Sequence, residues 1–232
     1  MSIILNLDTA TETASVCIAR EGITLAMRSS TEQKDHASWI QPAIMEVLQE
    51  AGIVLRDVQA VAVTAGPGSY TGLRVGMATA KGLCYTLKIP LITENTLLVM
   101  AWAAREKQLL MTGSEDAAEM LYCPMIDARR MEVFTALYDG GLNEIMPPAA
   151  LVLEPSTFKE ALNNHTVCFT GSGAGKWKHL CTHPNARYSD NANILAPSLA
   201  KIATGLFLQR KFSDLAYAGP VYLKEFYSHN KK

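Results

Sequence analysis

The stretch "ILNLDTATETASVCIAREG", residues 4–22, decides the fold, because its pattern recurs in the second half of the chain. An apolar run typical of a strand ends in Asp8, a short polar turn follows, a second apolar run returns, and a glycine closes the unit. Residues 122–141, "YCPMIDARRMEVFTALYDGG", have the same order, and Asp127 takes the place of Asp8. This repeat predicts a duplicated chain with two hairpins of the same design.

The segments after each hairpin extend the repeat to β-β-β-α-β-α. In the first half they read as strands at 3–9, 14–19 and 23–29, a helix with its apolar stripe over 40–51, a buried strand at 58–66 and a helix at 69–87. In the second half a third strand at 150–154, a helix near 156–163 and a strand at 166–171 follow the hairpin. By analogy, the pattern predicts an α/β fold of duplicated ribonuclease-H-like lobes, as in the actin/hexokinase/Hsp70 (ASKHA) class.

Three regions divide the chain in this interpretation. Residues 1–107 form the N-terminal lobe, and residues 121–232 form the C-terminal lobe, with the last segment packing back on the first. Between them, "MTGSEDAAEM" (111–120) has no periodicity, so 108–120 is expected to be a linker or mobile loop.

Composition and charge narrow the function classes. The chain has 232 residues with 21 Lys and Arg against 22 Asp and Glu, and this balance argues against a module that binds tRNA directly. Asp8 comes too early for a secretory signal, and no apolar run is long enough to span a bilayer. The five cysteines are scattered without a CxxC pair, so we expect a cytoplasmic protein that does not contact a membrane.

Five stretches together resemble one family over almost the whole chain. They are "LNLDTATETASVCIA", "HASWIQPAI", "AGPGSYTGLRVGMATAKGL", "IDARRMEVFTALY" and "AGPVYLK", and they look like the TsaB (YeaZ) family, with Lys224 where an arginine is expected. The resemblance implies a non-catalytic accessory subunit in the synthesis of threonylcarbamoyladenosine (t6A) in tRNA. It would dimerise with and activate TsaD, which transfers the threonylcarbamoyl group from threonylcarbamoyl-AMP to N6 of adenosine 37 in tRNAs that read codons beginning with A.

The resemblance also implies the other partners and the cofactors. The ATPase TsaE would join TsaD in a ternary complex, tRNA would be contacted indirectly, and the chain would form a homodimer when TsaD is absent. Nucleotide and metal would come through TsaD and TsaE, and no cofactor of its own is expected. In TsaD two histidines one helical turn apart hold the metal, and here Thr96 and Met100 stand at those places, so no metal ligand and no catalytic residue are expected.

A vestigial nucleotide cleft is expected between the two hairpins. In "GSGAGK" (171–176) three residues, not four, separate Gly171 from Gly175, and Trp177 replaces the hydroxyl residue, so the motif fails as a phosphate-binding P-loop. A tight structural turn is the alternative there. The residues expected to line the cleft are Asp8, Thr9, Gly66, Gly68, Asp127, Gly171 and Gly173.

The helix expected at 69–87 carries small residues every fourth position, at Gly72, Gly76, Ala80 and Cys84. Glycine weakens a helix, so this row indicates close contact with another element. That contact is either within the chain or with TsaD in an intersubunit helix bundle; in the second case Gly72→Leu or Gly76→Leu would leave a folded monomer that no longer binds TsaD. The expected interface consists of His36, Trp39, Ile40, Ala43, Val47, Tyr70, Gly72, Leu73, Gly76 and Ala80.

A small ATP-dependent kinase or ATPase of the same fold class is the alternative function. Phosphoryl transfer needs metal ligands, a nucleotide site and a positioned base. Asp8 and Asp127 are candidate ligands, but the sequence shows neither a clear base nor a complete nucleotide motif.

Overall fold

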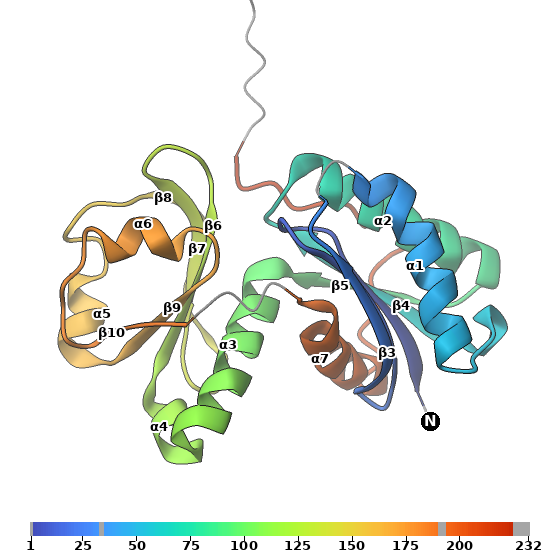
Figure 1. Ribbon diagram of the computed structural model, residues 1–232, viewed down its shortest axis with the longest axis horizontal. Coiled ribbons are helices and arrows are strands. Elements are labelled where there is room, and N and C mark those ends of the chain that lie inside the picture. The colour runs from blue at the N-terminus through green and yellow to red at the C-terminus, as the bar shows by residue number, and fades with distance from the viewer. Residues whose placement is uncertain (1, 33–34, 190–193, 225–232) are drawn as a thin grey trace, which may run out of the picture.

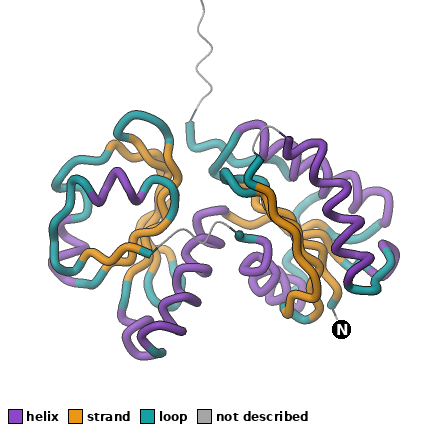
Figure 2. Tube along the Cα trace, in the orientation of Figure 1, coloured by secondary structure: helices purple, strands orange, loops and turns teal. Residues whose placement is uncertain are grey.

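Two mixed five-stranded sheets form the protein, and helices cover their faces (Figures 1 and 2). The computed structural model describes residues 2–32, 35–189 and 194–224. The first sheet has the order β3-β2-β1-β4-β5 and contains β1 (Ile3–Asp8), β2 (Ala14–Arg20), β3 (Ile23–Ser30), β4 (Ala60–Gly66) and β5 (Leu91–Asn95). The second has the order β10-β9-β6-β7-β8 and contains β6 (Leu121–Asp127), β7 (Glu132–Tyr138), β8 (Glu144–Val152), β9 (Val167–Thr170) and β10 (Ala186–Tyr188).

The two sheets have the same topology. In each, the first strand lies at the centre, antiparallel to the second strand and parallel to the fourth. The predicted duplication of ribonuclease-H-like lobes is therefore confirmed. Each lobe also has a fifth strand beyond the repeat, β5 in the first lobe and β10 in the second, and β10 was not predicted. Asp8 and Asp127 end equivalent strands, as the repeat indicated.

Helices cover both faces of the first sheet, which explains why β1 and β4 are buried on both sides. α1 (His36–Glu50) and α2 (Tyr70–Leu87) pack on the face that carries Leu5 and Leu7, and the short 3-10 turn η2 (Leu55–Asp57) precedes β4. α7 (Ala196–Leu208) covers the opposite face, so residues after the second lobe lie against the first.

The second sheet is covered by α5 (Lys159–Asn164) and α6 (Ala174–Lys178) on its outer face and by α3 (Thr96–Thr112) on its inner face (Figure 1). One apolar cluster joins the lobes, because it draws side chains from both sheets, from α3 and from α7. Ile4 and Ala62 come from the first sheet, and Tyr122 and Tyr138 from the second. Shared burial of this kind holds the two lobes in one arrangement.

The segment expected to be a linker loop is helical, which corrects the interpretation of 108–120. α3 continues to Thr112, and α4 (Ser114–Glu119) follows after Gly113. The hydroxyl of Tyr122 donates a hydrogen bond to the carbonyl oxygen of Ala117 at 2.9 Å and ties α4 to β6. The sequence showed no periodicity in 111–120 because the described side chains there are exposed apart from Ala117 and Met120, and two buried residues do not make an apolar stripe.

Candidate functional site

The glycines between β4 and α2 allow this turn to pack on the turn between β1 and β2. The amide of Ser69 donates to the carbonyl oxygen of Ala10 at 2.7 Å, and a Cβ at Gly68 would lie 2.2 Å from that same oxygen. The Ser69 hydroxyl accepts from the amide of Gly72 at 3.3 Å, so Ser69 is the N-cap of α2. The amides of Ser69, Gly72 and Gly66 are thus bonded within the protein, the last of them to the hydroxyl of Thr96 at 3.2 Å. These amides cannot also hold a phosphate.

The row of small residues on α2 faces the chain's own sheet, which corrects its interpretation as a partner surface. A Cβ at Gly72 would lie 2.0 Å from the carbonyl oxygen of Thr9, and one at Gly76 would lie 2.4 Å from the Thr9 hydroxyl. That hydroxyl donates to the carbonyl oxygen of Gly72 at 2.7 Å. Leucine at either glycine would therefore disrupt the lobe itself, so the prediction that these variants remain folded monomers is wrong.

Most of the other expected interface residues are also buried in the first lobe. His36, Ile40, Ala43, Val47, Leu73 and Ala80 are buried, Trp39 is half-buried and Tyr70 is at the exposed end of the helix. Burial lowers the pKa of His36, whose imidazole is hydrogen-bonded to the backbone of Glu12 in the β1–β2 turn. His36 thus anchors the start of α1 on the cleft hairpin.

A different row of α2 is open to solvent. Thr71, Ala78 and Gly82 are exposed, and a Cβ at Gly82 would meet no described atom within 4 Å. Tyr85 follows at the end of this row and is 79% exposed. On the neighbouring α1, which contacts α2, Met45 is 63% exposed. These five exposed residues define the outward face of the α1–α2 pair; their side chains are apolar or small, and the exposed Arg74 lies between Thr71 and Ala78 in the same row.

Asp8 is completely buried at the end of β1 and does not line the cleft. Its Oδ1 accepts from the Thr64 hydroxyl at 2.6 Å and from the amide of Ala10 at 3.2 Å. Burial raises the pKa of this carboxyl to about 6, although both hydrogen bonds act in the opposite direction. Asp8 therefore ties β1 to β4.

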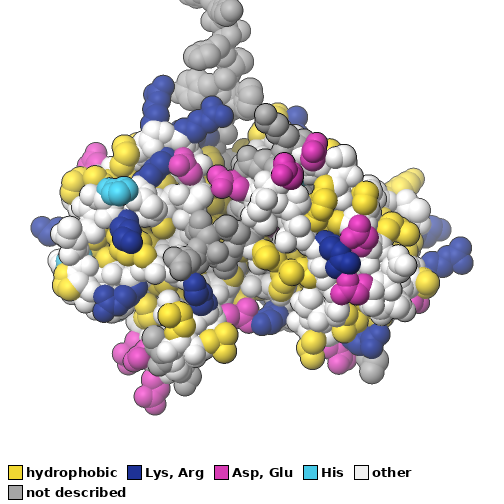
Figure 3. Space-filling view, in the orientation of Figure 1, with side chains coloured by type: hydrophobic (Ala, Val, Ile, Leu, Met, Phe, Trp, Pro, Cys, Tyr) yellow, Lys and Arg dark blue, Asp and Glu magenta, His cyan; other side chains and the backbone are white. Residues whose placement is uncertain are grey.

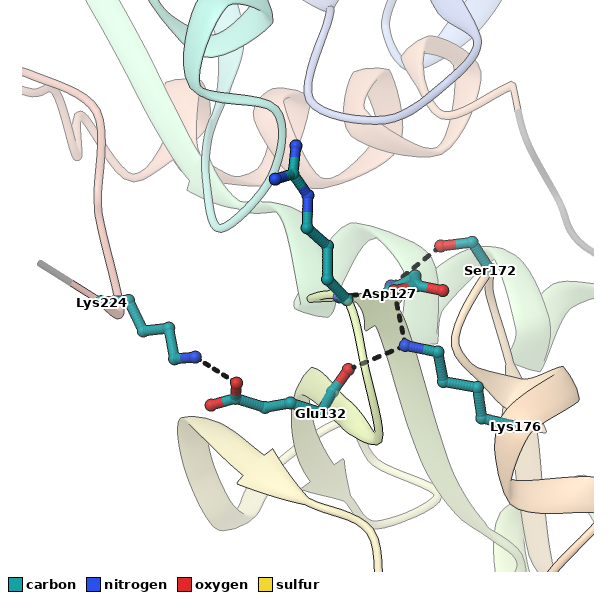
Figure 4. A network of polar contacts seen from close by, with 6 residues as sticks. Asp127, Glu132, Ser172, Lys176 and Lys224 are labelled. Carbon is teal, nitrogen blue, oxygen red and sulfur yellow. Dashed lines mark hydrogen bonds and ion pairs between the residues drawn. The ribbon is translucent and has the colours of Figure 1, made fainter. Parts of the chain in front are cut away.

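Asp127 is at the surface of the second lobe and is neutralised by a lysine (Figure 4). The Lys176 ammonium donates to Asp127 Oδ1 at 2.6 Å and to the carbonyl oxygen of Glu132 at 3.2 Å. The amide of Arg129 donates to the same carboxylate oxygen at 2.6 Å, and the Ser172 hydroxyl accepts from the amide of Asp127 at 3.0 Å. Partial burial acts to raise the pKa of Asp127, but the Lys176 and Arg129 contacts outweigh it and hold the pKa below its usual value.

The "GSGAGK" glycines bring α6 close to β6. A Cβ at Gly171 would lie 2.3 Å from the carbonyl oxygen of Met125, and the amide of Gly173 donates to that oxygen at 3.0 Å. This close packing places Lys176 within reach of Asp127. The tight structural turn considered for these glycines is what the structure contains.

A cavity of about 260 Å³ lies between the lobes where the four turns meet. Of the residues expected to line the cleft, Gly68, Asp127 and Gly171 do so, whereas Asp8, Thr9, Gly66 and Gly173 do not. Its walls are formed by Ala10, Thr11, Glu12, Gly68, Ser69, Met100, Ile126, Asp127, Arg129, Phe134, Thr170, Gly171, Ser172 and Leu195.

The C-terminal segment 213–224 crosses from the first lobe to the second beside this cavity (Figures 1 and 4). The amide of Val221 donates to the carbonyl oxygen of Ala65 at 2.7 Å, and the Tyr222 ring lies 5.2 Å from that of Tyr70. Lys224 then forms an ion pair with Glu132 of β7. The segment therefore links the start of α2 to the second hairpin.

The described residues contain no group of three His, Cys, Asp or Glu side chains placed to hold a metal ion. Thr96 is buried and bonded to Gly66, and Met100 lines the cavity. None of the helices in the described ranges is both long and apolar enough to cross a membrane.

Comparison with known proteins assigns the family. The tRNA threonylcarbamoyladenosine biosynthesis protein TsaB of Escherichia coli (strain K12) is 31% identical over 227 residues, which cover 95% of this chain and 94% of that protein. The chain belongs to the TsaB family. The protein of the same name from Bacillus subtilis (strain 168) is 31% identical over 153 residues, 65% of this chain and 62% of its own length.

Structure and family model agree with membership of the TsaB family. YeaZ from Pseudomonas aeruginosa superposes with a TM-score of 0.79 at 28% identity, covering 96% of this chain and all of that one. A family model described as "TsaD: tRNA N6-adenosine threonylcarbamoyltransferase" matches residues 28–154. This TsaB-family chain is therefore similar to TsaD from β3 to the loop after β8.

Sequence reasoning missed two features of this TsaB-family chain. Lys176 was noted only as the end of a failed P-loop, and the signal that could have found its role is a lysine beside two glycines after β9. The segment ending at Lys224 gave no signal that it bonds to Glu132, because this contact joins residues 92 positions apart.

Proposed function

We propose that this chain is the non-catalytic accessory subunit that pairs with TsaD in t6A synthesis. In this role it would be required with TsaD and TsaE for transfer of the threonylcarbamoyl group from threonylcarbamoyl-AMP to N6 of adenosine 37 in tRNA. Membership of the TsaB family supports the pathway. The observation that carries the accessory role is that Asp8 and Asp127 are both committed to contacts within the chain.

The outward face of the α1–α2 pair is the proposed surface for TsaD. Ala78 and Gly82 would let a partner helix approach closely, while Met45 and Tyr85 supply apolar anchors of the kind that dominate interfaces. Tyr217, 89% exposed, extends this surface, because Lys81 on α2 donates to the carbonyl oxygens of its neighbours Ala216 and Ala218. A second copy of the chain would use the same face in a homodimer when TsaD is absent.

The other partners follow from charge. Lys and Arg side chains are interspersed with Asp and Glu on the face shown in Figure 3, and the net charge is -1. Non-specific binding to a phosphate backbone needs an excess of positive charge. We therefore propose that tRNA is contacted indirectly. The likeness to the TsaB family supports the further proposal that nucleotide and metal enter through TsaD and TsaE, and the scattered cysteines without a CxxC pair support a cytoplasmic complex.

Reconstitution tests this proposal. TsaD, TsaE, tRNA and threonylcarbamoyl-AMP are incubated with and without the chain, and t6A is quantified by mass spectrometry of nucleosides. We expect t6A to form at a substantial rate only when the chain is present, and a Gly82→Arg variant with unchanged thermal unfolding to behave like its omission. Equal t6A in both reactions would contradict the proposal, and ATP turnover by the chain alone with Mg²⁺ would favour the kinase or ATPase alternative.

A further inference from the structure

Arg74 of α2 is exposed, and two tyrosine side chains hold its guanidinium group. The guanidinium carbon lies 3.9 Å from the centroid of the Tyr70 ring, and Nε donates to the Tyr222 hydroxyl at 3.1 Å. The two tyrosine rings are themselves 5.2 Å apart. A planar guanidinium that is already stacked and hydrogen-bonded loses little conformational freedom when it binds another group. Arg74 is therefore pre-organised for a further contact.

The described chain supplies no acidic partner for Arg74. Among the described residues, no Asp or Glu side chain forms an ion pair with its guanidinium. α2 contains no acidic residue. Glu46 and Glu50 of the neighbouring α1 are both paired with Arg28 of β3, at 2.8 and 2.6 Å. The bond to Tyr222 uses Nε, so a carboxylate from another molecule can approach the terminal nitrogens.

We propose that Arg74 selects the partner at the outward face of the α1–α2 pair by binding an Asp or Glu side chain of TsaD. The inference rests on the proposed function, since it names the chemistry that TsaD would present at this face. Arg74 lies between Thr71 and Ala78 in the exposed row of α2, so a helix packed on that row comes within its reach. Arginine is enriched among the residues that dominate interfaces, and its planar fork binds carboxylates with two parallel hydrogen bonds.

The same charge disfavours a second copy of the chain at this face. Two copies related by a two-fold axis would bring two Arg74 side chains to one interface, and α2 offers no carboxylate to offset them. Asp214 of the C-terminal segment is engaged within the chain, because its Oδ1 accepts from the amides of Ala216 and Tyr217 at 2.8 and 3.1 Å. Like charges at an interface reduce affinity. Arg74 would therefore favour TsaD over self-association.

Tyr222 is the positioning residue for Arg74. It belongs to segment 213–224, which is attached to the first lobe through the bond from the Val221 amide to the Ala65 carbonyl oxygen at 2.7 Å. Its hydroxyl accepts from Arg74 and fixes the direction of the guanidinium. Tyr222→Phe removes this hydroxyl and keeps the ring. The C-terminal segment would thus contribute to TsaD affinity by holding Arg74.

Isothermal titration of full-length variants with TsaD tests the inference. Arg74→Met should bind TsaD about 10- to 100-fold more weakly than wild type, because hydrogen bonds to charged groups contribute this much. Added salt should weaken the binding of wild type more than that of Arg74→Met. Tyr222→Phe should weaken the binding of wild type but have no further effect in Arg74→Met. The matched control is Arg210→Met, an exposed arginine just after α7 on the opposite face of the first sheet, and it should bind as wild type.

Self-association separates a role in partner choice from a structural role. By sedimentation equilibrium, the homodimer of Arg74→Met should be no weaker than that of wild type, because a like-charge contact is removed. An equal loss of affinity for TsaD and for the second copy would overturn the inference, since it would mean that α2 is disturbed. Wild-type affinity and salt dependence in folded Arg74→Met and Arg74→Gln would also overturn it and leave the proposed function standing. Absence of TsaD binding by wild type would overturn both.

Discussion

Alanine substitutions at Gly72 and Gly82 should change stability in opposite directions, although both glycines lie on α2. At Gly72 the new Cβ would lie 2.0 Å from the carbonyl oxygen of Thr9, which is a backbone atom at the end of β1. At Gly82 the new Cβ would meet no described atom within 4 Å. Intrinsic helix propensity alone would stabilise both variants, so only the approach of α2 to the first hairpin separates them.

The magnitudes follow from two terms. Replacing glycine by alanine inside a helix gains about 1 kcal/mol. Overpacking a filled site costs about 1–3 kcal/mol, and the clash with a backbone oxygen puts Gly72→Ala at the upper end. We therefore expect Gly72→Ala to lose about 1–2 kcal/mol and Gly82→Ala to gain about 1 kcal/mol. With about 2–4 °C per kcal/mol for a chain of this size, Tm should fall by about 2–8 °C in the first variant and rise by about 2–4 °C in the second.

Thermal unfolding followed by far-UV circular dichroism measures both shifts under one condition. The wild-type chain and the two variants are compared at the same concentration, because a homodimer would make Tm concentration-dependent. An unchanged or raised Tm for Gly72→Ala would refute the reasoning about close approach. A lowered Tm for Gly82→Ala would show that the outward row is covered by part of the chain.

Further predictions concern Asp8, the C-terminal segment and the cysteines. The pKa of Asp8 is about 6 in the folded chain against an ordinary 3.8, so the native state binds more protons between these values and stability falls as pH rises through them. Chemical unfolding of the wild-type protein across pH 4 to 7 should show this loss of unfolding free energy, about 3 kcal/mol in full, and Asp8→Asn should not show it. Parallel curves of unfolding free energy against pH for the two proteins would contradict the prediction. Gly66→Ala would place a Cβ 2.4 Å from the carbonyl oxygen of Val221 and should speed hydrogen exchange at the Val221 amide, whereas Gly175→Ala, with no described atom near its Cβ, should leave it unchanged. Removing the exposed Lys224–Glu132 pair with Lys224→Met should cost less than about 1 kcal/mol in unfolding free energy, and a larger loss would mean that the pair is more shielded than its exposure indicates. Burial raises the pKa of Cys123 to about 12, and of the five cysteines, all within the described ranges, only Cys181 is not buried. A thiol reagent at pH 8 should therefore modify Cys181 first and the other four only after unfolding. Fast modification of Cys123 in the folded protein would contradict its burial.

The sequence predicted the strands of the two hairpins well because local patterns determine them, whereas β8 was expected at 150–154 and lies at Glu144–Val152. The β1–β2 and β6–β7 hairpins each combine apolar runs, an aspartate and a turn within about twenty residues, and both occur where the repeat placed them. The last turn of α3 and the short α4 were harder, because the described side chains of 111–120 are exposed apart from Ala117 and Met120, which are too few to form an apolar stripe.

The orientation of α2 could not be predicted from its own residues. Two rows of small side chains run along this helix, one through Gly72 and Gly76 and the other through Ala78 and Gly82. Helical spacing identifies both rows equally well. Only the position of Thr9, brought against α2 by the sheet, shows that the first row faces inward. The Lys176–Asp127 contact likewise depends on packing between segments 49 residues apart.

Isothermal titration of TsaD with this chain tests the central claim most directly. The account predicts measurable binding for the wild-type chain and for Gly82→Ala, and no binding for Gly82→Arg with an unchanged unfolding transition, because an arginine side chain would separate the helices at the outward face of the α1–α2 pair. Absence of binding by the wild-type chain would contradict the accessory role. Binding of folded Gly82→Arg with wild-type affinity would place the TsaD contact on another surface.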